Sequence, residues 1–276
     1  MKTANNKNFG QLQNMAKQMR INAIKLAYKA GENGAHLGGG LSPIEILAVL
    51  YGKILSLNPE KRDDPERDRF VLSKGHGTLA YYTALYEAGL ISREELFSFE
   101  DNGGPFPGHP VRNLQYGIEC SGGSLGTGIS VAVGLALAAK IDKRRNKIYT
   151  LVGDGECNEG AVWEAAMSAV HYGLNNLIVI VDRNGLQSDG RCDEVFHTAP
   201  LENIWRGFGW DVEVVDGHKI EDLVQTLEKR CDSPKVVIAN TVKGKGISFM
   251  ENLREWHHST LNEKQYLQAL QELGAE

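Results

Sequence analysis

One stretch of the sequence, residues 147–190, constrains the fold more than any other part of the chain. Two apolar runs within it, at 148–152 and 177–181, predict buried strands. Asp154 follows the first run in a Gly-Asp-Gly turn, Asn184 follows the second in an Asn-Gly turn, and a helical pattern separates the two. This order predicts a right-handed βαβ unit, whose two turns lie at the same edge of a parallel sheet. We therefore expect Asp154 and Asn184 to lie side by side.

Polar side chains at these two turns predict a site for a metal ion and a phosphate group. A Gly-Asp-Gly turn alone is a weak signal, but a carboxylate and an amide oxygen that meet above a helix N-terminus suit a Mg²⁺ ion that carries a diphosphate. Glu159 lies at the start of the helix between the two strands. It could favour the helix dipole, or it could be a buried carboxylate that faces a partner beside the diphosphate.

The rest of the chain continues the alternation of strands and helices. Such a pattern predicts an α/β fold with a mainly parallel sheet and helices on both faces. We expect strands at 69–72, 148–152, 177–181, 210–215 and 235–240, helices at 11–30, 42–55, 221–230 and 263–273, and further helices that begin near 77, 92, 128 and 159. Loops are expected at 34–40, 101–117, 188–203 and 241–259. Because no linker or repeat is present, we expect a single domain over 1–276, with an N-terminal helix at 11–30, a core over about 31–261 and a C-terminal helix at 263–273.

Composition and charge narrow the class of protein. The chain has 276 residues, of which 24% are charged and 42% hydrophobic, and this is typical of a globular protein with a substantial core. A net charge of −5 without a basic cluster argues against a nucleic-acid partner. We expect no membrane span and no signal peptide, because no apolar run approaches roughly 20 residues. The four cysteines form no CxxC pair, which indicates reduced thiols and a cytoplasmic location.

Histidines in glycine-rich turns are the second group of candidate functional residues. Four histidines lie in such turns: His36, His76, His109 and, less clearly, His257. Because loops at one edge of a parallel sheet converge on one crevice, we expect these imidazoles to meet there, where they could hold substrate hydroxyls or move protons. The other four have no such context, and a structural role is favoured for His171, His197, His218 and His258.

Several of these segments resemble those of the transketolases. The Gly-Asp-Gly turn at 153–155, followed by Asn184 after the next strand, resembles the thiamine diphosphate motif that several enzyme families share. Residues 68–77, DRFVLSKGHG, and residues 108–110, GHP, match segments typical of transketolases, and residues 122–128, GGSLGTG, are similar to their TGxLGQG segment. The chain is therefore identified by resemblance as a member of that family.

The histidine loops extend the resemblance, with departures. His36 lies in a loop similar to the family's first Gly-His loop, and Thr127 stands where the family usually has glutamine. Residues 256–257, Trp-His, are similar to the family's late histidine segment, but His258 follows where the family usually has glycine. The resemblance favours His257 as the active-site histidine, and His258 remains the alternative.

The resemblance implies a role for each matching residue. Asp154, Asn184 and the carbonyl oxygen of Leu186 would bind a divalent metal ion, Mg²⁺ or Ca²⁺. Thiamine diphosphate would contact His76, Gly123, Ser124, Leu125, Asp154, Gly155, Asn184 and His257. Sugar contacts and proton transfers would fall to His36, His76, His109 and His257, and Glu159 would match the interface glutamate that couples paired active sites.

The resemblance covers only the first, pyrophosphate-binding domain of a transketolase. It implies the N-terminal subunit of a split enzyme, which would transfer a two-carbon ketol unit from a ketose phosphate to an aldose phosphate, by default the pentose phosphates, together with a separate C-terminal, pyrimidine-binding subunit. Two such pairs would form a dimer of heterodimers. Two alternatives remain: the α subunit of a 2-oxo acid dehydrogenase, which shares the thiamine diphosphate motif, and a non-catalytic cofactor-binding or regulatory half-domain.

Overall fold

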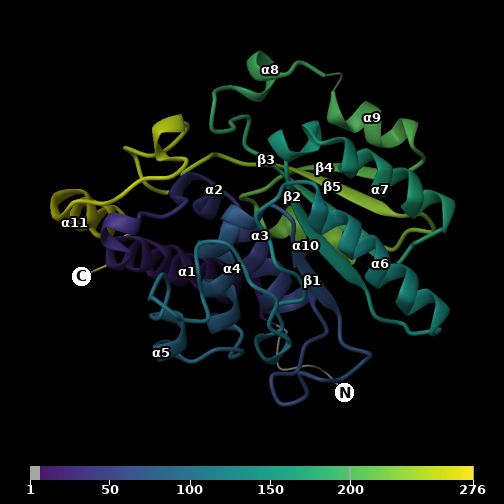
Figure 1. Cartoon of the computed structure of the whole chain (residues 1–276), viewed down its shortest axis with the longest axis horizontal. Helices are drawn as coiled ribbons and strands as arrows, with labels where there is room; N and C mark the ends of the chain where they lie inside the picture. The colour runs from purple at the N-terminus through teal and green to yellow at the C-terminus, as the bar shows by residue number, and fades with distance from the viewer. Residues whose placement is uncertain (1–6, 199, 276) are drawn as a thin grey trace.

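A five-stranded parallel sheet forms the centre of the molecule in the residues that the structure describes (Figure 1). The computed structural model describes residues 7–198 and 200–275. The strands are β1 (Arg69–Leu72), β2 (Ile148–Gly153), β3 (Leu177–Arg183), β4 (Asp211–Asp216) and β5 (Lys235–Asn240), in the spatial order β1-β2-β3-β5-β4. All the pairings between these strands are parallel. The predicted fold class is confirmed; the expectation about a signal peptide depends partly on residues 1–6, which lie outside the described residues.

Helices cover both faces of the sheet, as Figure 1 shows. One face packs against α1 (Phe9–Lys29), α3 (Ile44–Val49), α4 (Thr78–Glu87) and α10 (Ile220–Glu228), with α11 (Glu263–Glu272) on α1; the other packs against α6 (Thr127–Ile141), α7 (Gly160–His171) and α9 (Leu201–Gly207). Successive side chains of a strand point to opposite faces. Tyr149 and Leu151 of β2 therefore join the first core, and Ile148 and Val152 join the second.

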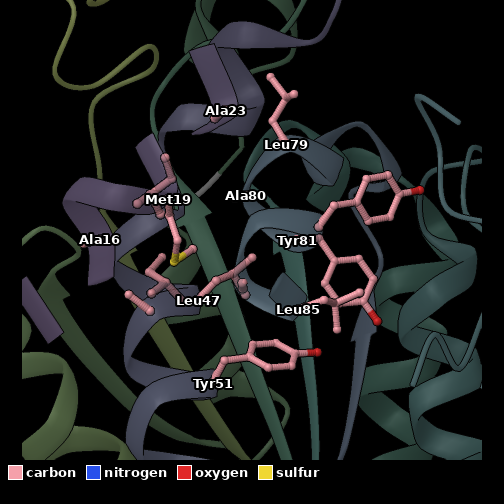
Figure 2. Close-up of a cluster of buried hydrophobic side chains, with 14 of the residues drawn as sticks. Ala16, Met19, Ala23, Leu47, Tyr51, Leu79, Ala80, Tyr81 and Leu85 are labelled. Carbon is pink, nitrogen blue, oxygen red and sulfur yellow. The ribbon is translucent and has the colours of Figure 1, made fainter. Parts of the chain in front are cut away.

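The core on the α1 face holds the segments that carry two of the candidate histidines. Figure 2 shows Met19 of α1, Leu47 of α3 and Tyr81 of α4 within one cluster, and all three are buried. Removing a side chain such as Leu47 from this cluster would cost about 2–5 kcal/mol of stability. α4 begins directly after the turn that holds His76, so this packing fixes the position of that imidazole relative to the sheet.

Helix ends follow the capping chemistry of the sequence. The predicted capping box of Ser92 and Glu95 is present at the start of α5 (Arg93–Leu96). Similar capping boxes precede α1, with Asn8 and Gln11, and α11, with Asn262 and Gln265. The N-terminal helix runs over 9–29 rather than 11–30, and the C-terminal helix over 263–272 rather than 263–273.

The segment from 34 to 55 differs from the prediction of a glycine loop followed by one helix. It contains α2 (Leu37–Leu41), α3 and a π-helical turn at Leu50–Ile54. Ser42 does not cap α3 as predicted, because its hydroxyl donates a hydrogen bond of 2.6 Å to the buried Asp182 instead. The predicted loop 188–203 likewise contains α8 (Cys192–Val195) and the start of α9.

The same segment is also more apolar than expected. Leu37–Ile54 has the length and the mean hydropathy, 1.2, of a possible membrane span, although 83% of it is buried within the fold. This burial matches its position in the core between α1 and α4. It is therefore accounted for as a core element.

Candidate active site

The carboxyl ends of β2 and β3 bring the two predicted turns into contact. The strands pair in parallel along their length, and each is followed by one of the turns. One carboxylate oxygen of Asp154 accepts a hydrogen bond from the Gly185 N–H at 2.6 Å, and the other accepts one from the Gly155 N–H at 2.9 Å. The Gly-Asp-Gly turn thus touches the Asn184-Gly185 turn, as the βαβ connectivity predicts.

Oxygen atoms at these turns suit a divalent cation. Asp154 is 8% exposed, and among the described residues no salt bridge to it occurs. Its burial raises the pKa of the Asp154 carboxyl, against the opposing effect of the Gly185 N–H. The Asn184 side-chain oxygen accepts a hydrogen bond from the Leu186 N–H at 3.1 Å, and the Leu186 carbonyl accepts one from the Lys243 ammonium at 3.1 Å.

This donor set fits Mg²⁺ or Ca²⁺. A carboxylate, a side-chain amide and a backbone carbonyl are hard oxygen ligands, which both ions prefer. A cation would also compensate the charge of a carboxylate that is buried without a cationic partner. No group of three His, Cys, Asp or Glu residues that could hold a metal occurs among the described residues, and this is consistent with a site in which two of the three donors are amide oxygens.

A buried ion pair supports the end of β3, and no local pattern in the sequence indicates it. Lys74 and Asp182 are both 0% exposed and form a salt bridge. Burial alone would raise the pKa of the Asp182 carboxyl, but Lys74 and the hydroxyls of Ser42 and Thr241 hold it below its usual value. Asn184 is two residues further on and contacts the same carboxylate at 3.5 Å. The pair therefore fixes the base from which the predicted metal ligand projects.

Glu156 supports the neighbouring turn and is a second residue that the sequence patterns did not single out. It is 2% exposed and accepts hydrogen bonds from the Ser73 hydroxyl at 2.5 Å, the Gly126 N–H at 2.8 Å and the Gly153 N–H at 2.9 Å. Burial raises the pKa of this carboxyl. Glu156 therefore joins the end of β1, the end of β2 and the 122–128 loop.

These elements surround a cavity of about 430 Å³. Of the residues predicted to contact the diphosphate, the cavity is lined by His76, Leu125, Asp154, Gly155, Asn184 and His257. Gly123 and Ser124 are exposed. Gly123 has a φ of +144°, and its nitrogen would lie 2.7 Å from a Cβ on Gly75. A backbone that approaches this closely needs glycine at both positions.

The predicted histidines also come together, and His36 lies at their centre. Its ring centroid is 5.7 Å from that of His76, 5.0 Å from His109, 5.7 Å from His257 and 4.5 Å from His258. His258, for which a structural role was favoured, is thus a fifth member of the cluster. The expectation was wrong at this position because the sequence pattern did not show which loop the 241–259 segment would contact.

Four of the clustered imidazoles are neutral at neutral pH. Burial, followed by the neighbouring imidazoles, lowers the pKa of His36 to about 3, and burial together with Lys243 lowers that of His257 to about 4. The pKa values of His76 and His109 are also lowered, in each case mainly by burial. A neutral imidazole can both donate and accept a hydrogen bond. These rings can therefore hold hydroxyl groups without adding positive charge.

The remaining histidines lie elsewhere. His171 is exposed at the end of α7. His197 lines a separate cavity beside Arg191. His218 bonds through Nδ1 to Glu45 at 2.9 Å and accepts the Val242 N–H at Nε2, a structural role.

Lys243 is the third functional residue that the sequence did not indicate. It is 1% exposed, and its ammonium contacts both the Leu186 carbonyl and, at 3.0 Å, the Nδ1 atom of His257. Burial lowers the pKa of Lys243 to about 8. The available signal was the Lys-Gly-Lys-Gly pattern at 243–246, in which Gly244 has a φ of +73°. A lysine beside such a glycine can be held in a tight turn and directed inward.

Glu159 is exposed at the start of α7 and lines the same cavity. Its side chain lies against Gly126, where an added Cβ would come within 2.9 Å of the Glu159 Cβ. Glu159 is the N-cap residue of α7, but its side chain makes no capping hydrogen bond. Of the two interpretations, a carboxylate available to a partner agrees better with this exposure.

Nearly the whole chain matches one protein family. Residues 11–276 match the family model described as the transketolase, thiamine diphosphate binding domain. The chain belongs to the transketolase family. It is the N-terminal subunit of a split, thiamine diphosphate-dependent transketolase, and so part of a transferase, because relatives of the same length are themselves subunits.

Two of these relatives define the similarity. One of the two subunits of the apulose-4-phosphate transketolase of Actinobacillus succinogenes is 43% identical over 98% of this chain and 99% of its own length. The 6-deoxy-6-sulfo-D-fructose transketolase subunit of a Clostridium species is 42% identical over 96% of this chain and 97% of its own length. The family match decides against the α subunit of a 2-oxo acid dehydrogenase and against a non-catalytic half-domain.

Solved transketolases share the fold. The transketolase of Campylobacter jejuni superposes with a TM-score of 0.90 and 31% identity, over 98% of this chain and 44% of that one. The transketolase of Pichia stipitis, in complex with sedoheptulose-7-phosphate, gives a TM-score of 0.87 and 28% identity, over 96% of this chain and 41% of that one. The chain thus spans less than half the length of these solved transketolases.

Proposed function

We propose that this subunit, together with a separate C-terminal subunit, transfers a two-carbon ketol unit from a ketose phosphate to an aldose phosphate. The observation that carries the proposal is the contact of Asp154 with the Asn184-Gly185 turn beside a cluster of neutral imidazoles. An oxygen-lined cavity at the ends of the strands would take the cofactor, and the adjacent rings would take the sugar. The two parts of the site thus match the two reactants.

The predicted residues would hold the cofactor as follows. Asp154, Asn184 and the Leu186 carbonyl would bind Mg²⁺ or Ca²⁺, which would bridge to the diphosphate of thiamine diphosphate. The diphosphate would be contacted by His76, Gly123, Ser124, Leu125, Gly155, Asn184 and His257. When bound, the cofactor supplies the electron sink for cleavage of a carbon–carbon bond.

The side chains of this subunit would position the substrate and carry protons. His36, His76, His109 and His257 would accept and donate hydrogen bonds to sugar hydroxyls and move protons at those oxygens. Their low pKa values keep each ring available as an acceptor at neutral pH. The Lys243 ammonium, 3.0 Å from Nδ1 of His257, would orient that ring.

The assembly that we propose is a dimer of heterodimers, a heterotetramer. Glu159 is exposed at the edge of the cavity and would meet a partner there. Residues 1–276 would act as one pyrophosphate-binding domain, since both cores pack on a single sheet. A cytoplasmic location agrees with the free state of all four cysteines. We propose neither a nucleic acid nor a membrane as a partner.

The choice of sugar is open to direct assay. Pentose phosphates are the default substrates, but the two relatives described above are named for apulose-4-phosphate and for 6-deoxy-6-sulfo-D-fructose. A donor panel for this complex should therefore include branched and sulfonated ketoses besides pentulose phosphates. The donor with the highest kcat/KM would identify the pathway type.

The test is reconstitution. We expect the purified subunit, supplied with thiamine diphosphate and Mg²⁺, to show no ketol transfer, and the complex with its C-terminal subunit to show it. Turnover by the isolated N-terminal subunit would refute the need for a partner. A complex that decarboxylates pyruvate but transfers no ketol unit would refute the reaction itself.

A further inference from the structure

A second cavity, of about 450 Å³, lies on the other side of the histidine cluster from the predicted cofactor site. His36, His109 and His258 line it together with Glu100 and several glycine and proline residues. Among the described residues that line it, Glu100 is the only acidic side chain, and neither lysine nor arginine is present. The cavity is thus rich in hydrogen-bonding groups but offers no lysine or arginine to an anionic ligand.

Backbone pairing places His258 in this cavity. Ala35 and Ser259 form an antiparallel bridge, in which each N–H donates to the other's carbonyl at 3.0 Å. In such a bridge the next residues along, His36 and His258, face each other on one side. Their ring centroids are accordingly 4.5 Å apart with planes at 70°. The register therefore directs His258 toward His36.

Gly34 leaves the space that the His258 ring needs. This glycine has a φ of +65°, and a Cβ at that position would lie 2.9 Å from Cε1 of His258 and 3.0 Å from the Ser259 carbonyl oxygen. A side chain there would be strained by the backbone conformation and would also displace the imidazole. The position of His258 is therefore built into both loops.

Glu100 is held over the opposite wall by an uncommon backbone conformation. It has a φ of +58°, and its N–H donates to the Phe106 carbonyl at 3.1 Å. Its carboxylate lies above Gly108, where an added Cβ would come within 2.4 Å of Glu100 Oε1. A non-glycine residue with positive φ costs about 1–2 kcal/mol, and such strain tends to persist at functional sites. The carboxylate is thereby placed next to His109.

We propose that His258 and Glu100 form a hydroxyl-recognition subsite for the part of the sugar chain beyond the transferred two-carbon unit, and that they help set the choice of sugar. This inference rests on the proposed function. An imidazole and a carboxylate on facing walls can donate to and accept from neighbouring sugar hydroxyls. Because the cavity contains a carboxylate and neither lysine nor arginine, a phosphate or sulfonate at the far end of the sugar would have to be bound outside it, on the partner subunit.

The expected discrimination follows from hydrogen bonding. A site that is built to bind a hydroxyl rejects an analogue that lacks it, because the polar groups of the site are then left unpaired. Wild type should therefore prefer an acceptor aldose with hydroxyls beyond the reacting carbon, such as D-erythrose, over glycolaldehyde, which has too few to reach the subsite. Removing either side chain should reduce that preference.

The test compares acceptors in the reconstituted complex. We expect His258→Gly and Glu100→Gln to lower kcat/KM for D-erythrose by about 10-fold or more, and for glycolaldehyde by a much smaller factor, in line with the loss of one charge-assisted or neutral hydrogen bond. His258→Asn, which keeps a donor and an acceptor, should recover part of the loss. His171→Asn and Glu94→Gln, both at exposed positions outside the cavity, are the matched controls and should not change the ratio.

Two other outcomes would separate this inference from the proposed function. Equal factors for both aldoses, or no change for either, would overturn the subsite although wild type transfers a ketol unit. If wild type shows no transfer, the proposed function itself fails. Thiamine diphosphate affinity of each variant complex, measured by calorimetry, should equal that of wild type, and a parallel loss of affinity would assign His258 a structural role instead.

Discussion

The two cavities on either side of the histidine cluster are built in different ways. The cavity at Asp154 rests on strand ends and on buried charges, namely Lys74, Asp182 and Glu156. The cavity at His258 rests on loops that are held by a two-bond backbone bridge, and the His36 ring at its centre carries no charge at neutral pH. The difference matches their proposed ligands: a diphosphate with a metal ion needs fixed charges, whereas a sugar needs neutral groups that donate and accept.

The comparison has a structural consequence. Charges under the first cavity lie on the sheet, the most rigid part of the fold, and any change there affects both stability and cofactor binding. Rings around the second cavity can change with smaller effects on the fold, because a loop position such as His258 supports little of the core. We expect substrate range to vary through the second cavity while the first stays constant.

Asp154→Ala should break the first cavity alone, and its effect should be the largest. We expect the affinity of the complex for thiamine diphosphate with Mg²⁺ to fall on the order of 1,000-fold, about 4 kcal/mol, because a metal ligand is lost. The fold should persist, since the buried carboxylate forms no salt bridge with any other described residue. Calorimetry with and without a chelator measures the loss.

Two control variants sharpen this test. Asp154→Asn keeps an acceptor for the Gly185 N–H but loses the charge, so its affinity should fall between those of wild type and Asp154→Ala. Asp142→Ala, at an exposed position after α6, should bind as wild type does. An unchanged affinity in Asp154→Ala would remove the metal assignment.

Lys74→Met should show that the first cavity depends on the buried pair. Removing one partner leaves the Asp182 carboxylate uncompensated in the core, which typically costs about 3 kcal/mol or more. Denaturant unfolding should therefore report a large loss of stability, and the double variant Lys74→Met/Asp182→Asn should recover part of it. Lys219→Met, which removes an exposed pair with Asp222, should cost less than about 1 kcal/mol. A loss in Lys74→Met no larger than in this control would contradict the argument.

Much of the first cavity could be predicted from the sequence, because its signals are local. Apolar runs predicted β2 and β3, and the turns after them placed Asp154 beside Asn184 by connectivity alone. Asp182 and Glu156 were not predicted, because their partners Lys74 and Ser73 lie far away in the sequence. Buried charges of this kind follow from tertiary packing, which no local pattern records.

The second cavity was harder to predict. Four of the clustered histidines stood out because they lie in glycine-rich turns, but His258 did not, since only the Ala35–Ser259 bridge turns it toward His36. Ser42 was wrongly expected to cap a helix for a related reason. Its hydroxyl could satisfy either a local backbone N–H or a distant carboxylate, and the buried Asp182 was the stronger partner.

The neutral state of His36 predicts the smallest effect, a dependence of stability on pH. The pKa of His36 is about 3 in the folded protein and about 6.5 when the chain is unfolded. Below pH 6.5 the unfolded chain therefore binds a proton that the folded protein does not, so the contribution of His36 to stability is present above pH 6.5 and is lost as the pH falls toward 3.

His36→Asn isolates this contribution. Between pH 7 and pH 5 wild type should lose about 1 kcal/mol more of its free energy of unfolding than the variant does, a figure reduced for the partial exposure of the ring. Urea unfolding at a series of pH values measures the difference, and His171→Asn, at an exposed position, should follow wild type. Parallel curves for wild type and His36→Asn would mean that the ring is charged in the folded protein. The contrast between a charged first cavity and a neutral second one would then fail, because a cationic His36 could bind an anionic end of the sugar directly.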